Sequence, residues 1–398
     1  MAGQALRIAI VGGGIGGLAA ANALIRRGIT VNVYEQAPQL GEIGAGVLIT
    51  PNSLRLLERM GMGEAMAQSG ALIGPGSQYY RMDGTPVAPI LTTDSDGWNG
   101  MYGMHRADLL SILADALPAG VIHTGHKCVA FEQDNDVARL TFENGEVVEA
   151  DIVIAADGIQ SALQKYVVEP SSPTHSGSVA YRGLIPAADL PSWPKGVSQL
   201  WMGEGKHFLV YPVRSGELIN YVGFVPSGEH AKESWSAPGD PVALAEAFST
   251  WDPRVKELLA QVETTYWWGL YDREPLSKWT NGRLTLLGDA AHPMLPHLGQ
   301  GANQSIEDGA ALAKELVGTT TETAPDALQT YEAIRRTRTG EVQINARLNG
   351  ARYDSSYDDL AARDNEIVGS VALRTWLYDY DPEADPQRSD DATQPVSR

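Results

Sequence analysis

Short apolar runs and helical spacing alternate in the N-terminal part of the chain. Residues 6–11 and 151–156 are nearly uninterrupted apolar segments, as expected for strands buried on both faces of a parallel sheet. Residues 18–27 repeat apolar positions at helical spacing up to Gly28, and residues 30–34 form another apolar strand. Strand, helix and strand in this order predict a Rossmann-like α/β domain in a chain that is α+β overall.

A second strand–loop–helix unit is predicted near residue 290. Residues 283–287 form an apolar run, residues 288–301 are rich in Gly and Pro, and a helix is expected from Ala302 to a stop at Gly318. A helix N-terminus presents free N–H groups and the positive end of the helix dipole, so we expect an anionic or electron-rich group there. The apolar positions that predict this helix are Ile306, Ala310, Ala313 and Val317.

Beyond residue 170 the pattern changes to alternating strands joined by turn residues, which predicts an antiparallel sheet. The expected strands are residues 178–184, 207–213 and 218–225, and the last two form a hairpin around Ser215-Gly216. Two further sites, Asp240-Pro241 and Asp252-Pro253, each predict a helix N-cap followed by proline at the first helical position.

The remaining segments complete an α/β architecture. We expect a second glycine-rich loop at residues 41–47, a hairpin turning at Asn144-Gly145, and helices over 51–60, from 105, and over 326–349. The polar residues 383–398 are expected to fray. We predict a discontinuous Rossmann-like domain at 1–72, 101–175 and 277–318, an inserted antiparallel-sheet domain at 73–100 and 176–276, and a C-terminal helical region at 319–398.

Composition narrows the classes of function. The formal net charge of −19 and the pI of about 4.8 argue against nucleic acid or an anionic membrane as a partner. The single Cys128 excludes an intramolecular disulfide and a cysteine-based metal site, and it suggests a reducing cytoplasm. Residues 8–25 carry no charge, as in a membrane span or signal segment, but their glycines favour a tight turn instead.

That turn carries a dinucleotide-binding pattern. Gly12, Gly14 and Gly17 form G-x-G-x-x-G between the first strand and helix, and Glu35 follows the second strand. Such glycines let the backbone approach a pyrophosphate, and the acid reaches a ribose hydroxyl. An acid at position 35 favours FAD or NAD over NADP, whereas the alternative interpretation is a purely structural turn.

The chain contains one such fingerprint and a separate glycine loop. This combination suits a flavin whose ADP part lies at residues 12–35 and whose ring lies at residues 288–303. N–H groups at the start of the helix would stabilise negative charge on the reduced ring. The interpretation requires the two segments to converge in space.

These motifs resemble the single-component FAD-dependent aromatic hydroxylases, flavoprotein monooxygenases that include salicylate, 3-hydroxybenzoate and 6-hydroxynicotinate hydroxylases. The resemblance rests on residues 12–17 with Glu35, on Arg106, on Asp157-Gly158, and on residues 288–293 and 299–301. It implies a para-hydroxybenzoate-hydroxylase-like fold, tightly bound FAD, and NADH or NADPH and O₂ as co-substrates. It also implies hydroxylation of a small aromatic substrate through a flavin C4a-hydroperoxide.

The same resemblance assigns cofactor contacts. Asp289 would contact the ribose–pyrophosphate region, and the N–H groups of Ala302 and Asn303 would face the isoalloxazine. Gln164 stands where the family commonly has Arg, which leaves the docking of the nicotinamide open, with Lys165 as a substitute. The predicted cofactor-binding set is Gly12, Gly14, Ile15, Gly17, Glu35, Gly46, Val47, Arg106, Val129, Asp157, Gly288, Asp289, Gly301, Ala302 and Asn303.

Catalytic candidates come from a strand and a loop. His207 and Tyr211 share one face of the strand, about 13 Å apart, so they would line two ends of a pocket. The resemblance places both in the substrate pocket. His297, which follows Pro296, could take a phenolic proton near neutral pH and is predicted as base or substrate-orienting group. The predicted catalytic set is His297, His207, Tyr211 and Pro296.

Other positions qualify the substrate. Arg182 could pair with a substrate carboxylate, with a structural ion pair as the alternative, and completes the predicted substrate-binding set of Arg182, His207, Tyr211, Pro296 and His297. His292 is expected to hold its loop. By resemblance, Leu48 stands where a nicotinate-type enzyme would carry histidine, which counts against that substrate.

The predicted activity is that of a salicylate hydroxylase-like enzyme. The alternatives are a 3-hydroxybenzoate 6-hydroxylase-like enzyme or a hydroxylase of a specialised-metabolite phenol, with NADH slightly favoured as reductant. The alternative hypotheses from other functional classes are a flavin oxidase and a non-catalytic flavin-binding module. We expect a cytoplasmic monomer or homodimer without a metal, a nucleic acid or a membrane partner.

Overall fold

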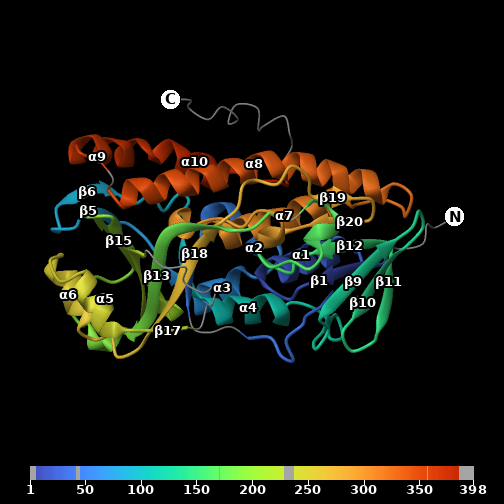
Figure 1. The fold of residues 1–398 in the computed structure, drawn as a ribbon, viewed down its shortest axis with the longest axis horizontal. Helices are drawn as coiled ribbons and strands as arrows, with labels where there is room; N and C mark the ends of the chain where they lie inside the picture. The colour runs from blue at the N-terminus through green and yellow to red at the C-terminus, as the bar shows by residue number, and fades with distance from the viewer. Residues whose placement is uncertain (1–5, 42–44, 170, 228–236, 356, 385–398) are drawn as a thin grey trace.

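A six-stranded sheet forms the first layer of the computed structural model, which describes residues 6–41, 45–169, 171–227, 237–355 and 357–384 (Figure 1). The strand order is β19-β20-β12-β1-β2-β8, and every pair is parallel except β19–β20. This layer confirms the predicted α/β class of the Rossmann-like domain. Its strands are β1 (Ile8–Val11), β2 (Val31–Tyr34), β8 (Ile122–His123), β12 (Ile152–Ala155), β19 (Thr280–Asn281) and β20 (Leu284–Leu286).

Two helices that follow glycine turns pack together beside this sheet. They are α1 (Ile15–Arg26) and α7 (Gly301–Glu315). A Cβ at Gly309 would lie 2.8 Å from the backbone of Ala20, so a glycine is needed where the two helices cross. Three further helices of the N-terminal part are α2 (Pro51–Arg59), α3 (Gly63–Ser69) and α4 (Arg106–Asp115).

The second large layer is an eight-stranded sheet in the order β17-β18-β13-β16-β15-β14-β5-β6, antiparallel except for the β14–β5 pair. It confirms the predicted antiparallel sheet, including the hairpin of β15 and β16. Segment 73–100 adds two strands to it, as the predicted insertion requires, although the domain boundaries themselves stay a prediction. The strands are β5 (Gln78–Arg81), β6 (Pro86–Pro89), β13 (Thr174–Pro186), β14 (Gln199–Gly203), β15 (Lys206–Val213), β16 (Leu218–Pro226), β17 (Ala237–Gly239) and β18 (Thr265–Asp272).

Local capping signals are confirmed beside this sheet. Asp240 and Asp252 accept hydrogen bonds from backbone N–H groups at the starts of α5 (Pro241–Ala247) and α6 (Pro253–Leu259). Both helices cover an apolar cluster on this sheet. The cluster contains Trp201, Phe248 and Trp251.

Two small sheets complete the strands. One has the order β11-β10-β9 and contains the hairpin predicted around Asn144-Gly145; the other is β3-β7-β4. The predicted loop at 41–47 is wrong at its end, because Gly46 and Val47 already pair with β7 in an antiparallel ladder, while residues 42–44 lie outside the described residues. These strands are β3 (Gly46–Ile49), β4 (Ala71–Leu72), β7 (Tyr102–His105), β9 (Cys128–Gln133), β10 (Ala138–Phe142) and β11 (Val147–Ala150).

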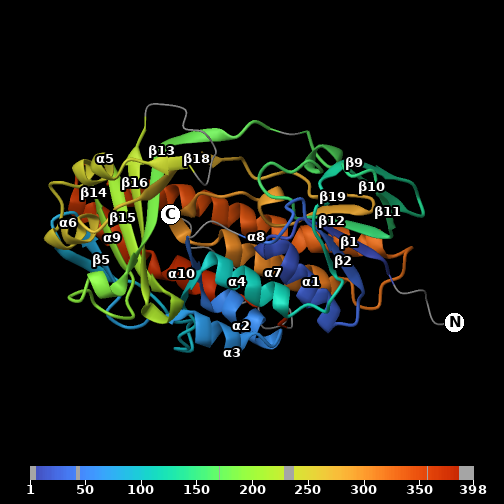
Figure 2. The same ribbon diagram turned by 90° about the horizontal axis from the view of Figure 1, so that it is seen from below.

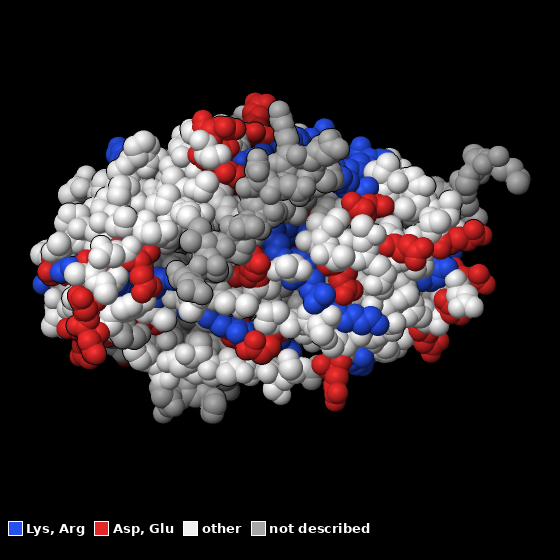
Figure 3. Space-filling model, turned by 90° about the horizontal axis from the view of Figure 1, so that it is seen from above, with Lys and Arg blue, Asp and Glu red and all other residues white. Residues whose placement is uncertain are grey.

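Three C-terminal helices join the two large layers: α8 (Ala324–Tyr353), α9 (Leu360–Gly369) and α10 (Val371–Asp379). Helix α8 contacts both β14 and β19. Figures 1 and 2 show that it extends along the molecule from the eight-stranded sheet to the six-stranded sheet. On the face that these helices form, acidic and basic side chains lie interspersed (Figure 3), and several of them pair, such as Arg352 with Glu366 at 2.8 Å.

One sequence expectation at a helix end is wrong, and the expected fraying of residues 383–398 is contradicted at its first residue. Helix α7 stops at Glu315, so Val317 lies beyond it and is 55% exposed instead of extending the apolar face. Glu383, the first residue of the tail that was expected to fray, forms ion pairs with Arg27 and Arg59. Residues 385–398 lie outside the described residues. In the described ranges, no helix combines the length and the apolar character that crossing a membrane requires.

Candidate active site

The predicted dinucleotide turn has the geometry that its three glycines require. Gly12 adopts φ +110°, and a Cβ there would lie 2.2 Å from a backbone oxygen; a Cβ at Gly17 would lie 2.0 Å from the oxygen of Gly12. Around Gly14, in contrast, the space is open. The turn therefore packs closely at the first and third glycines and leaves room for a pyrophosphate at the second. Glu35 accepts a 2.7 Å hydrogen bond from a backbone N–H of the turn.

The distant segments of the sequence meet at one cavity of about 320 Å³. Its wall combines the glycine turn, strand β3, the start of α4, the loop before α7 and one face of the eight-stranded sheet. This confirms the predicted convergence of residues 12–35 and 288–303. The predicted residues that line the cavity are Gly14, Ile15, Gly46, Val47, Arg106, Arg182, Tyr211, Gly288, Asp289, Pro296, Gly301 and Ala302.

Several predicted residues lie elsewhere. Val129 is 44% exposed on β9 and does not line the cavity. The side chain of Asn303 turns inward, where its Nδ2 donates to the backbone oxygens of Leu48 and Gly299 at 2.9 and 2.7 Å. Only its backbone N–H stays available for the predicted role. His207 and His297 line a second, adjoining cavity.

The sheet side of the large cavity is closely packed. The amide oxygen of Asn220 accepts from Gly46 N at 2.8 Å, and a Cβ at Gly46 would lie 2.6 Å from the Tyr211 hydroxyl oxygen. Burial raises the pKa of Tyr211, while the charges of Arg182 and Arg106 act in the opposite direction. Tyr211 is therefore a neutral hydroxyl beside two positive side chains at neutral pH.

The loop that carries Asp289 is anchored from two sides. Gln164 is buried and donates from Nε2 to the oxygen of Ala290 at 2.9 Å, so this departure from the family pattern serves as a loop anchor. His292 is fully buried and its Nε2 lies 2.6 Å from Asp308, as expected for a loop-holding residue. Asp289 itself is exposed and lines the cavity.

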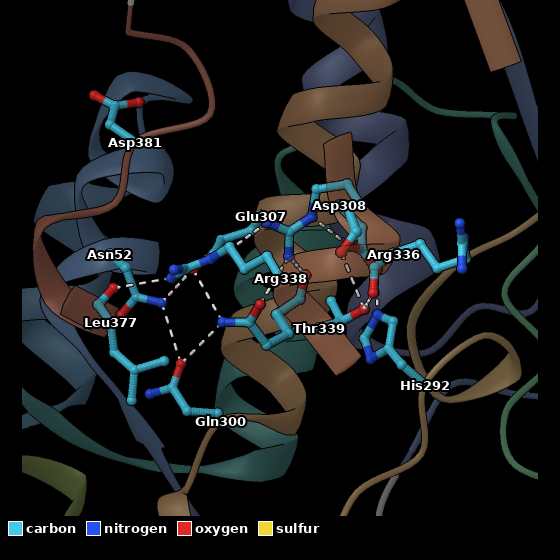
Figure 4. Close-up of polar contacts among 12 residues, drawn as sticks. Asn52, His292, Gln300, Glu307, Asp308, Arg336, Arg338, Thr339, Leu377 and Asp381 are labelled. Carbon is cyan, nitrogen blue, oxygen red and sulfur yellow. Dashed lines mark hydrogen bonds and ion pairs between the residues drawn. The ribbon is translucent and has the colours of Figure 1, made fainter. Parts of the chain in front are cut away.

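A buried ionic network supports the helix behind this loop (Figure 4). Glu307 and Asp308 on α7 are fully buried and lie 2.6 and 2.7 Å from Arg335 of α8, and Arg338 lies 2.9 Å from Glu307. Asn52 also donates to Glu307 at 2.6 Å. Despite burial, the nearby positive charges lower the pKa of Glu307 and that of Asp308, the latter to about 2.

A smaller cavity of about 50 Å³ adjoins the large one. Tyr211 lines the large cavity, His207 lines the small one, and Leu209 between them lines both. The strand thus carries its histidine and tyrosine to two ends of a divided site, as their spacing predicted. Pro296 also borders both cavities.

His297 lies in a three-member hydrogen-bonded chain. Its Nδ1 is 3.2 Å from Nε2 of His207, and Nδ1 of His207 is 2.7 Å from a carboxylate oxygen of Asp354 at the end of α8. Burial and the neighbouring His207 hold the pKa of His297 well below its usual range. His297 is therefore neutral at physiological pH.

Sequence reasoning missed Asp354. It follows the predicted end of the last long helix and carries no local motif, so only the packing of α8 on β15 brings it to His207. Asp354 and His297 also border an outer groove of about 480 Å³, which connects this chain of side chains with the surface.

The donors and acceptors around the large cavity fit FAD. Gly14 leaves open space at the first helix, and α7 begins at the cavity with N–H groups that have no acceptor within the helix. Asp157 does not itself line the cavity but lies between Ala156 and Gly158, which do. Its Oδ1 is buried without a hydrogen-bond partner among the described residues, which suits a cofactor hydroxyl. Its burial also raises the pKa of the Asp157 carboxyl.

Comparison with known proteins agrees with this site. Residues 5–346 match a family model described as an FAD binding domain. The 3-amino-4-hydroxybenzoate 2-monooxygenase of Streptomyces platensis is 37% identical over 386 residues, covering 94% of this chain and 96% of that protein. A salicylate hydroxylase of Pseudomonas putida is 33% identical, covering 96% and 94% of the two chains.

A solved salicylate hydroxylase substrate complex has the same fold, with a TM-score of 0.84, 27% identity, and coverage of 98% of this chain and 99% of that chain. This similarity extends over both large sheets and the C-terminal helices. The fingerprint, the converging cavity and the similarity over the full length lead to one conclusion. The chain belongs to the family of single-component FAD-dependent aromatic hydroxylases, which use NAD(P)H and O₂.

Proposed function

We propose that this enzyme hydroxylates a hydroxybenzoate. The observation that carries the proposal is the divided cavity, in which cofactor-binding segments form one compartment and His207 and His297 line the next. The names of the similar enzymes supply the substrate class, and their identities rank an amino-hydroxybenzoate ahead of salicylate, the substrate that the sequence favoured. Leu48 borders both compartments and presents an apolar wall where a pyridine substrate would gain from a polar one.

The large compartment would hold FAD, which supplies the oxygenating chemistry when it is reduced and O₂ is present. Glu35 would bind a ribose hydroxyl, Gly14 would admit the pyrophosphate, and Asp289 would bind the ribose–pyrophosphate side. The N–H groups of Ala302 and Asn303 would face the ring. Arg106 would place a positive charge beside it.

We assign the proton transfer to His297. The carboxylate of Asp354 only accepts, so Nδ1 of His207 carries the hydrogen of that bond. Nε2 of His207 then accepts from Nδ1–H of His297, which leaves Nε2 of His297 without a proton. That atom lies beside Gly350 of α8. In this proposal it would take the proton of the substrate hydroxyl, which would make the ring more electron-rich.

A screen of substrates tests this proposal. Purified enzyme with FAD is assayed for NADH and NADPH oxidation with hydroxybenzoates, amino-hydroxybenzoates and hydroxypyridines, and products are identified by mass spectrometry. We expect stimulation by one or more hydroxybenzoates together with a hydroxylated product. Stimulation by hydroxypyridines alone would contradict the assigned substrate class. The choice of NADH, a cytoplasmic location and the monomer-or-homodimer state stay predictions.

Removal of the Asp289 carboxylate is expected to weaken FAD retention. In Asp289→Ala the exposed loop keeps its anchors at Gln164 and His292, so the fold should persist while a cofactor contact is lost. We expect the dissociation constant of FAD, measured by flavin fluorescence, to rise by about 10-fold or more, as for the loss of one charged hydrogen bond. Unchanged FAD affinity would remove Asp289 from the cofactor site.

Asp354→Asn is expected to reverse the hydrogen bond to His207. The amide NH₂ donates to Nδ1, so the hydrogens of both histidines move to Nε2 and the proposed base becomes protonated at its accepting atom. Nitrogen NMR of histidine-labelled protein reports the tautomers directly. We expect Nδ1–H for His297 in the wild type and Nε2–H in the variant; identical tautomers would show that Asp354 does not position the base.

A further inference from the structure

Arg374 on α10 has its side chain at the small cavity that His207 and His297 also line. The residue is 8% exposed, so its guanidinium is largely shielded from water. Moving such a charge out of water is unfavourable unless a partner compensates it. The contacts of Arg374 therefore indicate what the cavity is built to receive.

Those contacts are neutral hydroxyl groups. Nη2 of Arg374 donates to the Tyr353 hydroxyl at 2.9 Å, Nη1 donates to the Tyr378 hydroxyl at 3.3 Å, and the guanidinium lies 5.8 Å from the ring centre of Tyr79. Nε is buried with no hydrogen-bond partner among the described residues. Because an arginine offers five N–H donors, the two tyrosines leave part of this fork unused.

Other buried arginines in the same helical layer are paired differently. Arg335 and Arg338 contact the carboxylates of Glu307 and Asp308, and Arg363 lies 2.7 Å from Asp364. Within the described ranges, no carboxylate lies within ion-pair distance of Arg374. Among the described residues, no anion compensates the charge of Arg374. The cavity in front of its guanidinium is therefore suited to a ligand that carries an anionic group.

We propose that Arg374, assisted by the hydroxyls of Tyr353 and Tyr378, binds the carboxylate of the substrate. The inference rests on the proposed function and names the residue that selects an aromatic acid. A planar carboxylate matches the guanidinium fork, and the two tyrosine hydroxyls add donors of the correct kind. This assigns the acid group to Arg374 and leaves Arg182 in the compartment next to it.

The size of the cavity orients the substrate. About 50 Å³ is room for a group of a few atoms, such as a carboxylate, and not for a benzene ring. The ring would lie where the two cavities join, between Leu209, Phe224 and Pro296, which border both. The substrate would thus span from Arg374 toward the cofactor compartment and pass the two histidines.

Equilibrium binding to the oxidised, FAD-loaded enzyme tests this assignment without turnover. Affinities for 3-hydroxybenzoate and for 3-hydroxybenzamide are measured by calorimetry in the wild type, Arg374→Met and the comparison variant Arg182→Met. We expect the wild type to prefer the acid. Arg374→Met should weaken binding of the acid about 10- to 100-fold and that of the amide less than about 3-fold. FAD content and melting temperature check the fold.

If Arg374→Met fails to load FAD, Arg374→Lys is tested instead, because lysine keeps the positive charge but lacks the two-pronged guanidinium. We then expect the affinity for the acid to fall several-fold while the affinity for the amide changes less. Equal losses for acid and amide, or a selective loss in Arg182→Met alone, would overturn the assignment. The assignment would also be overturned if the wild-type enzyme did not bind 3-hydroxybenzoate more tightly than 3-hydroxybenzamide. Oxygenation of neutral phenols by that enzyme would still leave the monooxygenase chemistry standing.

Discussion

His297→Gln is expected to lower kcat for aromatic hydroxylation by about 10²- to 10⁴-fold, the usual contribution of a general base. Glutamine retains a polar side chain of similar size but cannot take up a proton at neutral pH. The substrate hydroxyl would then stay protonated, the ring would be less reactive, and NADH oxidation would uncouple from product formation. FAD retention should change little, because His297 lines the small cavity and not the large one.

Stopped-flow product formation and the ratio of product to NADH consumed measure this effect. His126→Gln is a matched control, because this partly exposed histidine pairs with Glu146 beside the sheet of β9, β10 and β11. Its activity should stay within about 2-fold of the wild type, as is usual for a surface substitution. Full coupling in His297→Gln would take His297 out of the mechanism.

The pH dependence follows from the same residue. Burial and His207 lower the pKa of His297 well below its usual range, so the basic form persists as the pH falls below the ordinary value of 6.5. The acid limb of kcat in the wild type should therefore lie below pH 6.5. His297→Gln should lack this limb.

Arg335→Met is expected to destabilise the holoenzyme by about 3–5 kcal/mol, the cost of breaking a buried ion pair from one side. Arg335 is fully buried and contacts both Glu307 and Asp308, so its loss leaves two carboxylates with reduced compensation. The pKa of Asp308, now about 2, should rise, because a nearby positive charge that lowers it is removed.

Urea unfolding at saturating FAD measures the loss, because bound cofactor otherwise shifts the midpoint. Arg336→Met is the control on the next residue. Its side chain is 41% exposed and pairs with Glu332 at 3.5 Å in an i,i+4 arrangement, so a change of about 0–1 kcal/mol is expected. Similar losses in both variants would contradict a special role for the buried network.

Local patterns predicted much of the fold. The strand–turn–helix around Gly12, the hairpins and the proline-led helices depend on residues that are neighbours in sequence, and all are present. Alternation along β15 correctly placed His207 and Tyr211 on one face, because the side-chain period of a strand is fixed.

Features that depend on distant pairing were missed. The sequence pattern assigned no role to Glu307 and Asp308, because the arginines that pair with them lie on another helix. Asp354 and Arg374 reach the site only through the packing of α8 and α10. One signal was available: Arg374 interrupts an otherwise mostly apolar helix, where an unpaired charge would be costly.

The central claim is that the enzyme places one atom of O₂ on the ring of a hydroxybenzoate at the expense of NAD(P)H. Turnover of the substrate found in the screen under ¹⁸O₂ tests it most directly, with product mass, NAD(P)H consumption and peroxide recorded together. We predict one ¹⁸O atom in each product molecule and one NAD(P)H oxidised per product. Peroxide equal to the NAD(P)H consumed, with no ¹⁸O in the aromatic fraction, would contradict the account.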